Sequence, residues 1–307
     1  MPNLISLTDL TPAELAALVQ RAVQFANDDS PERVLEGRAV GIYFRRSSTR
    51  TRSAFWRAAT RLGADVITYG PEDLQLITGE TLEDTSRVLG QYLDALVVRT
   101  NDDVNEIRRL GSSPDLPVVN ALSLDEHPTQ AIADLGVLAE QFGALDGRHL
   151  LYVGEGNSSA AALAIGAALT PGFRLTVVTP PGYGLPDTVT DLVEKLSGGS
   201  VPVTQATSLA EVDAPVDAVY TSRWQTMGVP KADADWLSAF TGYGVDRALF
   251  DSVRAGHTIF LHDLPAVRGQ EVTDEMLDGP ESRAWRQAYY KMAGAMAVLE
   301  WCVLGQQ

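Results

Sequence analysis

The sequence predicts an α/β fold of two parallel-sheet, Rossmann-like domains with helices on both faces of each sheet. Short β-branched runs alternate with longer amphipathic segments along the whole chain. This alternation stops at a glycine-containing loop over 143–147 and then restarts. The 307 residues also exceed the ~100–200 that commonly share one hydrophobic core. We therefore place a domain boundary at this loop, between residues 1–142 and residues 143–283.

The first domain is expected to open with a capped helix, because Thr11 is followed by Pro12 and Glu14 in a capping-box pattern. Strands and helices then alternate, with predicted strands at 38–44, 64–70, 94–99 and 116–122 and predicted helices from about 48, 81, 102 and 127. The second domain repeats the order, with strands at 149–154, 174–178, 217–221 and 257–261 and helices at 157–169 and from about 186. Parallel sheets bind ligands at the carboxyl ends of their strands, so the cleft between the halves is the expected site.

Charge and composition exclude several classes of partner. The chain has 24 basic and 40 acidic residues, a net charge of −16 and a pI near 4.6, so its field repels nucleic acid and anionic membrane surfaces. No apolar run approaches the ~18 residues of a membrane span, and the amino terminus lacks the pattern of a signal peptide. The single cysteine, Cys302, lies in an apolar helical segment, which favours a reducing, cytoplasmic compartment over an intermolecular disulfide.

The stretch FRRSSTRTRSAF, residues 44–55, concentrates four arginines at a predicted strand-to-helix turn. A helix start offers unpaired backbone N–H groups, and hydroxyls with an arginine add donors for phosphate oxygens. The residues expected to face such an anion are Ser48, Thr49, Arg50 and Thr51. The alternative is a solvated helix start whose arginines pair with surface carboxylates. The hydroxyl–Arg–hydroxyl order directly after a strand favours the anion site.

A second candidate site lies at the start of the helix predicted from residue 127. His127 and Gln130 are three positions apart and face the same way, which suits polarising a carbonyl group and holding its amide. A histidine with a purely structural role is the alternative. Arg99 at a strand end, Gln75 in a loop, and His262 in LHDLPAVRG are further candidates.

Other chemistries have weaker support in the sequence. Gly154 and Gly156 follow a strand, but Ser159 stands where a dinucleotide-binding fingerprint has its third glycine. No spacing of His, Cys, Asp or Glu predicts a metal site, and no serine lies in a nucleophile elbow. We therefore expect neither a cofactor nor a metal.

Several motifs of this chain, in their order, resemble those of the aspartate/ornithine carbamoyltransferase family, nearest its ornithine branch. They are SSTRTR, DLQL with GETLEDTSRVLG, VVRT, HPTQAIADL, VGEGN, VYTSRWQTMG and HDLPAVRGQEV. The resemblance implies a carbamoyl phosphate domain over 1–142, an amino-acid domain over 143–283, and a final helix over about 284–307 that packs back on the first domain. It also implies a homotrimer with shared active sites.

The resemblance implies roles for individual residues. Phosphate would lie on Ser48, Thr49, Arg50, Thr51 and Lys291, the last standing where the family has an arginine. The carbamoyl group would be held by Arg99, His127, Gln130 and the Leu264 carbonyl, with Gln75 reaching a neighbouring subunit. The acceptor would contact Asn157, Ser158, Ser222, Thr226, Met227 and Asp263. Catalysis is expected from Arg50, Arg99, His127, Gln130 and Asp263.

Three departures from the family pattern fall on the acceptor side. Ser158 replaces a second asparagine, Ser222 followed by Arg223 replaces an aspartate, and Asp263 replaces a cysteine. Asp263 either pairs with Arg268, holds a cationic or polar group of the acceptor, or takes the proton of the attacking ammonium. The sequence thus predicts an N-carbamoyltransferase that uses carbamoyl phosphate and ornithine or a related amino acid. An aspartate-type enzyme and a non-catalytic carbamoyl phosphate-binding homologue are the alternatives.

Overall fold

A computed structural model describes residues 2–100, 102–225 and 231–305. The chain forms two compact units, one from Met1–Glu140 with Tyr289–Gln307 and one from Gln141–Ala288. Each contains a parallel sheet, which confirms the predicted fold class. We refer to them as the first and the second unit.

The first unit is built on a four-stranded parallel sheet in the order β2-β1-β3-β4. Its strands are β1 (Ala39–Phe44), β2 (Asp65–Tyr69), β3 (Ala95–Arg99) and β4 (Val118–Leu122). Phe44 pairs with Arg99, so β1 and β3 end level with each other. The turn after β1 and the end of β3 consequently lie at one edge of the sheet, where parallel sheets bind ligands.

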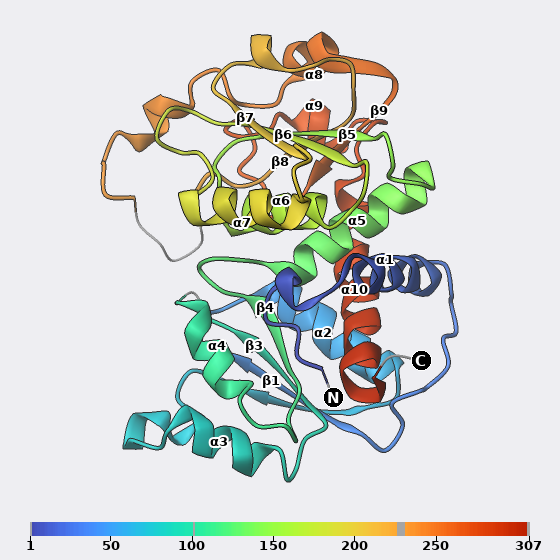
Figure 1. Cartoon of the computed structure of the whole chain (residues 1–307), viewed down its shortest axis with the longest axis vertical. Helices are drawn as coiled ribbons and strands as arrows, with labels where there is room; N and C mark the ends of the chain where they lie inside the picture. Colours follow the sequence, from blue (N-terminus) through green and yellow to red (C-terminus); the bar gives the residue numbers. More distant parts are fainter. Residues whose placement is uncertain (1, 101, 226–230, 306–307) are drawn as a thin grey trace. The chain divides into compact units, whose positions relative to one another are not determined.

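Helices cover both faces of this sheet, with α3 and α4 on one side and α1, α2 and α10 on the other (Figure 1). The helices are α1 (Pro12–Ala26), α2 (Thr49–Arg61), α3 (Leu82–Leu89), α4 (Val104–Leu110), α5 (Pro128–Phe142) and α10 (Ala284–Leu304). Helices α5 and α10 approach closely because α5 carries Gly136, where a Cβ atom would come within 2.7 Å of the Tyr290 ring. This contact sets the late helix α10 against the helix that begins after His127.

The second unit contains a five-stranded parallel sheet in the order β7-β6-β5-β8-β9. Its strands are β5 (His149–Val153), β6 (Arg174–Val178), β7 (Val203–Ala206), β8 (Val216–Thr221) and β9 (Arg254–His262). Figure 1 shows α6 (Ser158–Ala168) and α7 (Asp187–Ser197) on one face and α8 (Arg247–Val253) and α9 (Asp274–Asp278) on the other. Val153 pairs with Thr221, and Thr221 with His262, so three strands end together.

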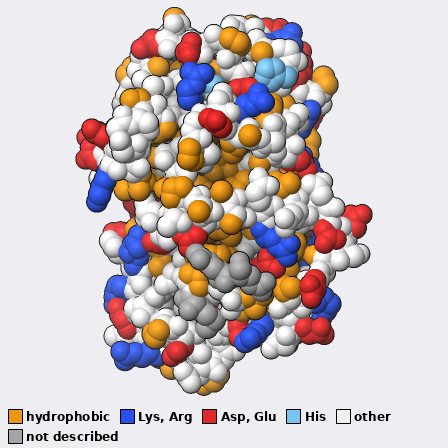
Figure 2. Space-filling view, turned by 45° about the vertical axis from the view of Figure 1, so that its right-hand side comes forward, with side chains coloured by type: hydrophobic (Ala, Val, Ile, Leu, Met, Phe, Trp, Pro, Cys, Tyr) orange, Lys and Arg blue, Asp and Glu red, His pale blue; other side chains and the backbone are white. Residues whose placement is uncertain are grey.

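Acidic and basic side chains are interspersed on the surface in view in Figure 2. Several arginines are engaged in ion pairs, as where Arg45 contacts Asp102 at 2.9 Å and Glu106 at 2.8 Å. Arg45, one of the four arginines of the opening basic stretch, therefore neutralises carboxylates of its own unit. Among the described helices, none is both long and apolar enough to cross a membrane.

A buried carboxylate links the amino-terminal segment to the turn before α5. Glu126 is 6% exposed, and its Oε1 accepts the Leu7 N–H at 2.8 Å, at the start of the 3₁₀ helix η1 (Leu7–Asp9). Burial raises the pKa of Glu126 to about 7, against an ordinary value of 4.5. The folded protein therefore binds this proton more tightly than the unfolded chain does.

Stability should accordingly fall as pH rises from about 4.5 through about 7. A Glu126→Gln variant keeps an oxygen for the Leu7 N–H but cannot ionise. Its free energy of unfolding should therefore decrease less over this pH range, by up to about 3 kcal/mol, than that of the unaltered protein. Urea unfolding at pH 5 and pH 8 measures the difference. An equal decline in both proteins would show that Glu126 does not control it.

Candidate active site

Three polar side chains converge at the carboxyl ends of β1 and β3 in the first unit. Arg99, the last residue of β3, is 5% exposed, and its Nη1 donates to Ser48 Oγ at 3.1 Å and to Thr51 Oγ1 at 3.2 Å. Ser48 is the N-cap residue of α2, and Thr51 lies in its first turn. The predicted phosphate turn and Arg99 are thus joined in one cluster.

The amino-terminal turn of α2 is suited to an anion. The Ser48 side chain accepts from Arg99 and makes no capping bond to the backbone N–H groups of the first turn. Thr49 and Arg50 are the first two residues of the helix, and Arg50 is partly exposed. Backbone donors, the positive end of the helix dipole and the arginines therefore give this turn a positive potential.

His127 lies immediately before α5 and is 4% exposed. Its pKa is well below the ordinary value, because burial and then the positive charges of Lys291 and Arg99 disfavour a charged imidazole. Within the described part of the chain, His127 Nδ1 makes no hydrogen bond. A neutral imidazole in this position can donate a hydrogen bond to a substrate oxygen.

Gln130 and Lys291 complete the cluster in the first unit. They line one small cavity together with His127 and Thr51. Lys291 comes from α10 and donates to Gln130 Oε1, while Gln130 Nε2 donates to Asp134 Oδ1 at 2.7 Å. Asp134 was not singled out in the sequence, although its position four residues after Gln130 on the same helix could have indicated it.

Gln75 has a different setting. It begins the 3₁₀ helix η2 (Gln75–Thr78), its side chain is exposed, and its Oε1 accepts from Thr78 at 3.4 Å. A role for Gln75 in a neighbouring subunit stays a prediction.

In the second unit, a buried network ties together the ends of β5 and β8. Burial raises the pKa of Tyr152 well above its ordinary value, so its phenol stays protonated and donates to the Glu155 carbonyl at 2.8 Å. Ser222 Oγ then donates to the Tyr152 oxygen at 2.5 Å and accepts from Asn157 Nδ2 at 2.8 Å. Ser222 is thereby fixed in place by its own unit.

Asn157 also serves as the N-cap of α6. Its Oδ1 accepts from the N–H groups of Ser159 and Ala160 at 3.0 and 3.1 Å. Ser158, the first residue of α6, is 9% exposed. Two of the polar residues predicted around the acceptor, Asn157 and Ser158, therefore lie at the start of this helix. Two further predicted contacts, Thr226 and Met227, lie outside the described residues.

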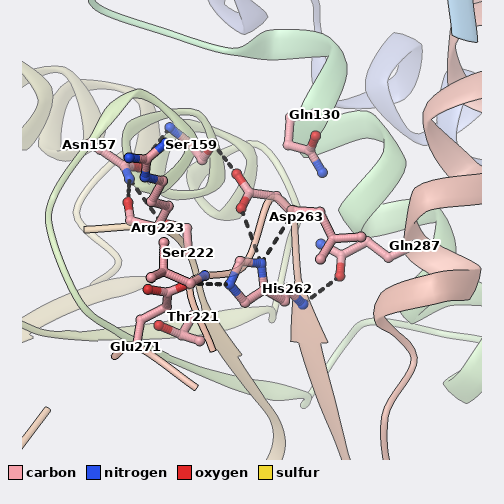
Figure 3. Close-up of polar contacts among 12 residues, drawn as sticks. Gln130, Asn157, Ser159, Thr221, Ser222, Arg223, His262, Asp263, Glu271 and Gln287 are labelled. Carbon is pink, nitrogen blue, oxygen red and sulfur yellow. Dashed lines mark hydrogen bonds and ion pairs between the residues drawn. The ribbon is translucent and has the colours of Figure 1, made fainter. Parts of the chain in front are cut away.

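Asp263 lies directly after β9, and its side chain is 15% exposed (Figure 3). Its Oδ2 accepts from Ser159 Oγ at 2.8 Å. No lysine or arginine of the described residues comes within ion-pair distance. The prediction that Arg268 could be its partner is wrong, because Arg268 binds Asp274 at 2.6 Å and Asp278 at 2.5 Å. No pattern in the sequence indicated that Ser159 would donate a hydrogen bond to Asp263.

The neighbouring His262 does not neutralise Asp263. His262 Nδ1 accepts the Leu264 N–H at 2.8 Å, so the ring carries its proton on Nε2, which lies 3.3 Å from Glu271 Oε1. The 3.7 Å approach of Nδ1 to Asp263 Oδ1 therefore brings a lone pair, not a proton, toward the carboxylate. Among the described residues, none donates a hydrogen bond to Oδ1 of Asp263.

The same contacts shape the loop after β9. Leu264 has a φ of 56°, a left-handed conformation that costs a residue with a side chain ~1–2 kcal/mol. Its N–H is held by His262, and Glu271 Oε1 accepts the Val267 N–H at 2.5 Å. His262 and Glu271 are both fully buried, and they hold the loop in this strained form.

Among the described residues, no group of three or more His, Cys, Asp or Glu side chains is arranged to hold a metal ion. The polar groups of the two clusters are hydroxyls, amides, guanidinium groups, one imidazole, one ammonium and the carboxylates of Asp134 and Asp263. These groups suit a small phosphate-bearing ligand and an amine.

Comparison with known proteins decides the family. The carbamoyl phosphate-binding domain model of aspartate/ornithine carbamoyltransferases matches residues 2–140, and the aspartate/ornithine-binding domain model matches residues 146–302. The chain belongs to the aspartate/ornithine carbamoyltransferase family. The predicted resemblance is therefore confirmed.

Individual relatives agree with this family. An ornithine carbamoyltransferase of Haloquadratum walsbyi is 38% identical over 299 residues, covering 97% of this chain and 96% of its own length. The ornithine carbamoyltransferase structure from Pyrococcus furiosus matches with a TM-score of 0.91 and 34% identity, covering 100% of this chain and 98% of its own. The ornithine carbamoyltransferase structure from Gloeobacter violaceus matches with a TM-score of 0.86 and 35% identity, covering 99% of this chain and 99% of its own.

Proposed function

We propose that the protein transfers the carbamoyl group of carbamoyl phosphate to an amine of ornithine or a related amino acid and releases phosphate. The observation that carries this proposal is the cluster in the first unit, where Arg99, Ser48 and Thr51 meet beside His127 and Gln130. It offers donors for a phosphate and for a carbonyl oxygen within one unit. Membership of the carbamoyltransferase family supports the same reaction.

The donor would be held and activated by the first unit. Phosphate binds the first turn of α2, with Ser48, Thr49, Arg50 and Thr51, and Lys291 adds a positive charge. Arg99 and His127 hold the carbonyl oxygen, which gains negative charge as the amine attacks. A fixed donor on such an oxygen contributes roughly 10²–10³ in rate.

The acceptor would be held by the second unit, with its ammonium on Asp263. This carboxylate is largely buried and has one hydroxyl partner, Ser159, so an ammonium would supply the positive charge that it lacks among the described residues. Asp263 can also take the proton that the amine must lose before it attacks. Asp263 would first bind the ammonium of the acceptor and then accept its proton before the amine attacks.

The acceptor's carboxylate would contact Arg223. Within the described part of the chain this arginine, which directly follows Ser222, makes no ion pair. Hydrogen bonds connect its surroundings to Asp263: Asn157 Nδ2 lies 3.5 Å from the Arg223 carbonyl, and Asn157 caps the helix turn that carries Ser159. The Arg223 backbone is thus linked through Asn157 to the helix turn that holds Asp263, and a cation and an anion in this part of the second unit would suit an amino acid, which carries both charges.

We also propose a homotrimer in the cytoplasm. The exposed side chain of Gln75 is compatible with a contact to a neighbouring subunit, and the buried thiol of Cys302, whose pKa burial raises, is protected from oxidation in a reducing compartment. Sedimentation at micromolar concentration should give the mass of three chains. A monomer at that concentration would contradict the shared site.

The function is tested by incubating the protein with carbamoyl phosphate and a mixed pool of amino acids and polyamines. We expect one or a few amines to gain the mass of a carbamoyl group, ornithine or another diamino acid among them. Binding of carbamoyl phosphate without any carbamoylated product would instead support the non-catalytic alternative.

A further inference from the structure

The side-chain amide of Gln130 lies between two groups of opposite hydrogen-bonding character. Its Nε2 donates to Asp134 Oδ1 at 2.7 Å, and its Oε1 accepts from Lys291 Nζ. Gln130 is 1% exposed and Asp134 is fully buried. Both contacts therefore form in surroundings where water cannot readily replace a lost partner.

These partners allow only one orientation of the amide. An ionised carboxylate can only accept hydrogen bonds, and an ammonium can only donate them. Rotating the amide by 180° would set its oxygen against Asp134 and its NH₂ group against Lys291, which breaks two charge-assisted bonds in a buried place. The oxygen of Gln130 must therefore be on the side of Lys291.

Gln130 and Lys291 both line the small cavity that His127 and Thr51 also line, which is where we place the carbamoyl group of carbamoyl phosphate. An amide oxygen has two lone pairs, of which Lys291 uses one. The other lone pair has no hydrogen bond from the described residues and can accept one from the NH₂ group of bound carbamoyl phosphate. A methyl group in the same place would leave this oxygen without that hydrogen bond.

We propose that Asp134 is a positioning residue that, with Lys291, fixes the oxygen of Gln130 toward the donor and so selects an acyl phosphate whose carbonyl carries NH₂ over one whose carbonyl carries CH₃. The inference rests on the proposed function and deepens it. Specificity arises because a buried acceptor rejects a ligand that cannot donate to it.

Two stable analogues test this inference, because phosphonoacetamide and acetonylphosphonate differ only in NH₂ against CH₃. Calorimetric titration of the full-length protein should show phosphonoacetamide binding about tenfold more tightly. In Asp134→Asn, whose side chain can accept or donate, this ratio should fall about 3- to 10-fold. In the double variant Asp134→Asn/Lys291→Met it should approach about one, because the lost phosphate attraction weakens both analogues equally and cancels from the ratio.

The matched control is Asp251→Asn, which makes the same change on helix α8 of the second unit. Asp251 lies four residues after Arg247 and 3.8 Å from its guanidinium group. Its ratio should equal that of the unaltered protein. If Asp134→Asn and the double variant keep the original ratio, even with both analogues bound more weakly, Asp134 only supports the helix and the inference is wrong. If the unaltered protein binds neither analogue, the proposed function itself fails, which is a distinct result.

Discussion

Arg50→Ala should lower carbamoyl transfer at least about 10²-fold, and the loss should appear mainly as a raised KM for carbamoyl phosphate. Arg50 lies in the first turn of α2, whose backbone N–H groups receive no side-chain cap from Ser48. Removing its guanidinium takes away a planar pair of donors for phosphate oxygens while leaving the weaker helix-end potential. Initial rates at varied carbamoyl phosphate concentration measure the effect.

A second arginine on the same helix provides the control. Arg57 is exposed on α2, two turns further from the turn that follows β1, and Arg57→Ala should leave both kinetic constants within about twofold. Unchanged KM and turnover in Arg50→Ala would contradict the assignment of the phosphate site. Equal losses in the two variants would point to the stability of α2 instead.

Asp263→Asn should lower kcat/KM for the acceptor about 10- to 100-fold while leaving the KM for carbamoyl phosphate nearly unchanged. The variant keeps a group that can accept from Ser159 Oγ, so the fold of the loop should persist. It removes the negative charge that would attract an ammonium. If Asp263 also takes the proton, the pH–rate profile of the variant should lose its limb at lower pH.

Two comparisons isolate the role of this charge. Ser159→Ala removes the hydroxyl partner but keeps the carboxylate, so its effect on the acceptor should be smaller. Asp213→Asn, at an exposed ion pair with Arg174, should have no effect. If kcat/KM for the acceptor is unchanged in Asp263→Asn, Asp263 does not bind the ammonium of the acceptor. If the pH–rate profile is unchanged in this variant, Asp263 does not take the proton.

Alternating β-branched and amphipathic segments were sufficient to predict most of the fold. The strands RAVGIYF and HLLYVG are buried on both faces of their sheets, and such strands leave a clear apolar run in the sequence. The edge strand β7 (Val203–Ala206) was not predicted, because its four residues are half exposed and show no such run. The short helices α8 and α9 were also missed, since five to seven residues hold too few turns to show a period.

The candidate site likewise contains residues that could be predicted from the sequence and contacts that could not. Residues next to strand ends and helix starts, such as Arg99, Ser48 and His127, could be predicted because local sequence sets their place. The partner of Asp263 could not, since Ser159 is 104 positions away and meets it only where the fold brings the first turn of α6 to the residue after β9. The proton position on His262 likewise depends on the fold of the loop, which brings the Leu264 N–H to Nδ1.

The most direct test of carbamoyl transfer follows the carbon itself. Purified protein is mixed with carbonyl-labelled ¹³C-carbamoyl phosphate and ornithine, and phosphate and labelled product are quantified together, with Arg50→Ala and Asp263→Asn in parallel. We predict one labelled N-carbamoyl amino acid for each phosphate released, at a rate that both variants reduce. Phosphate release at only the spontaneous rate, with no labelled amine formed from ornithine or any related diamino acid, would contradict the proposed function.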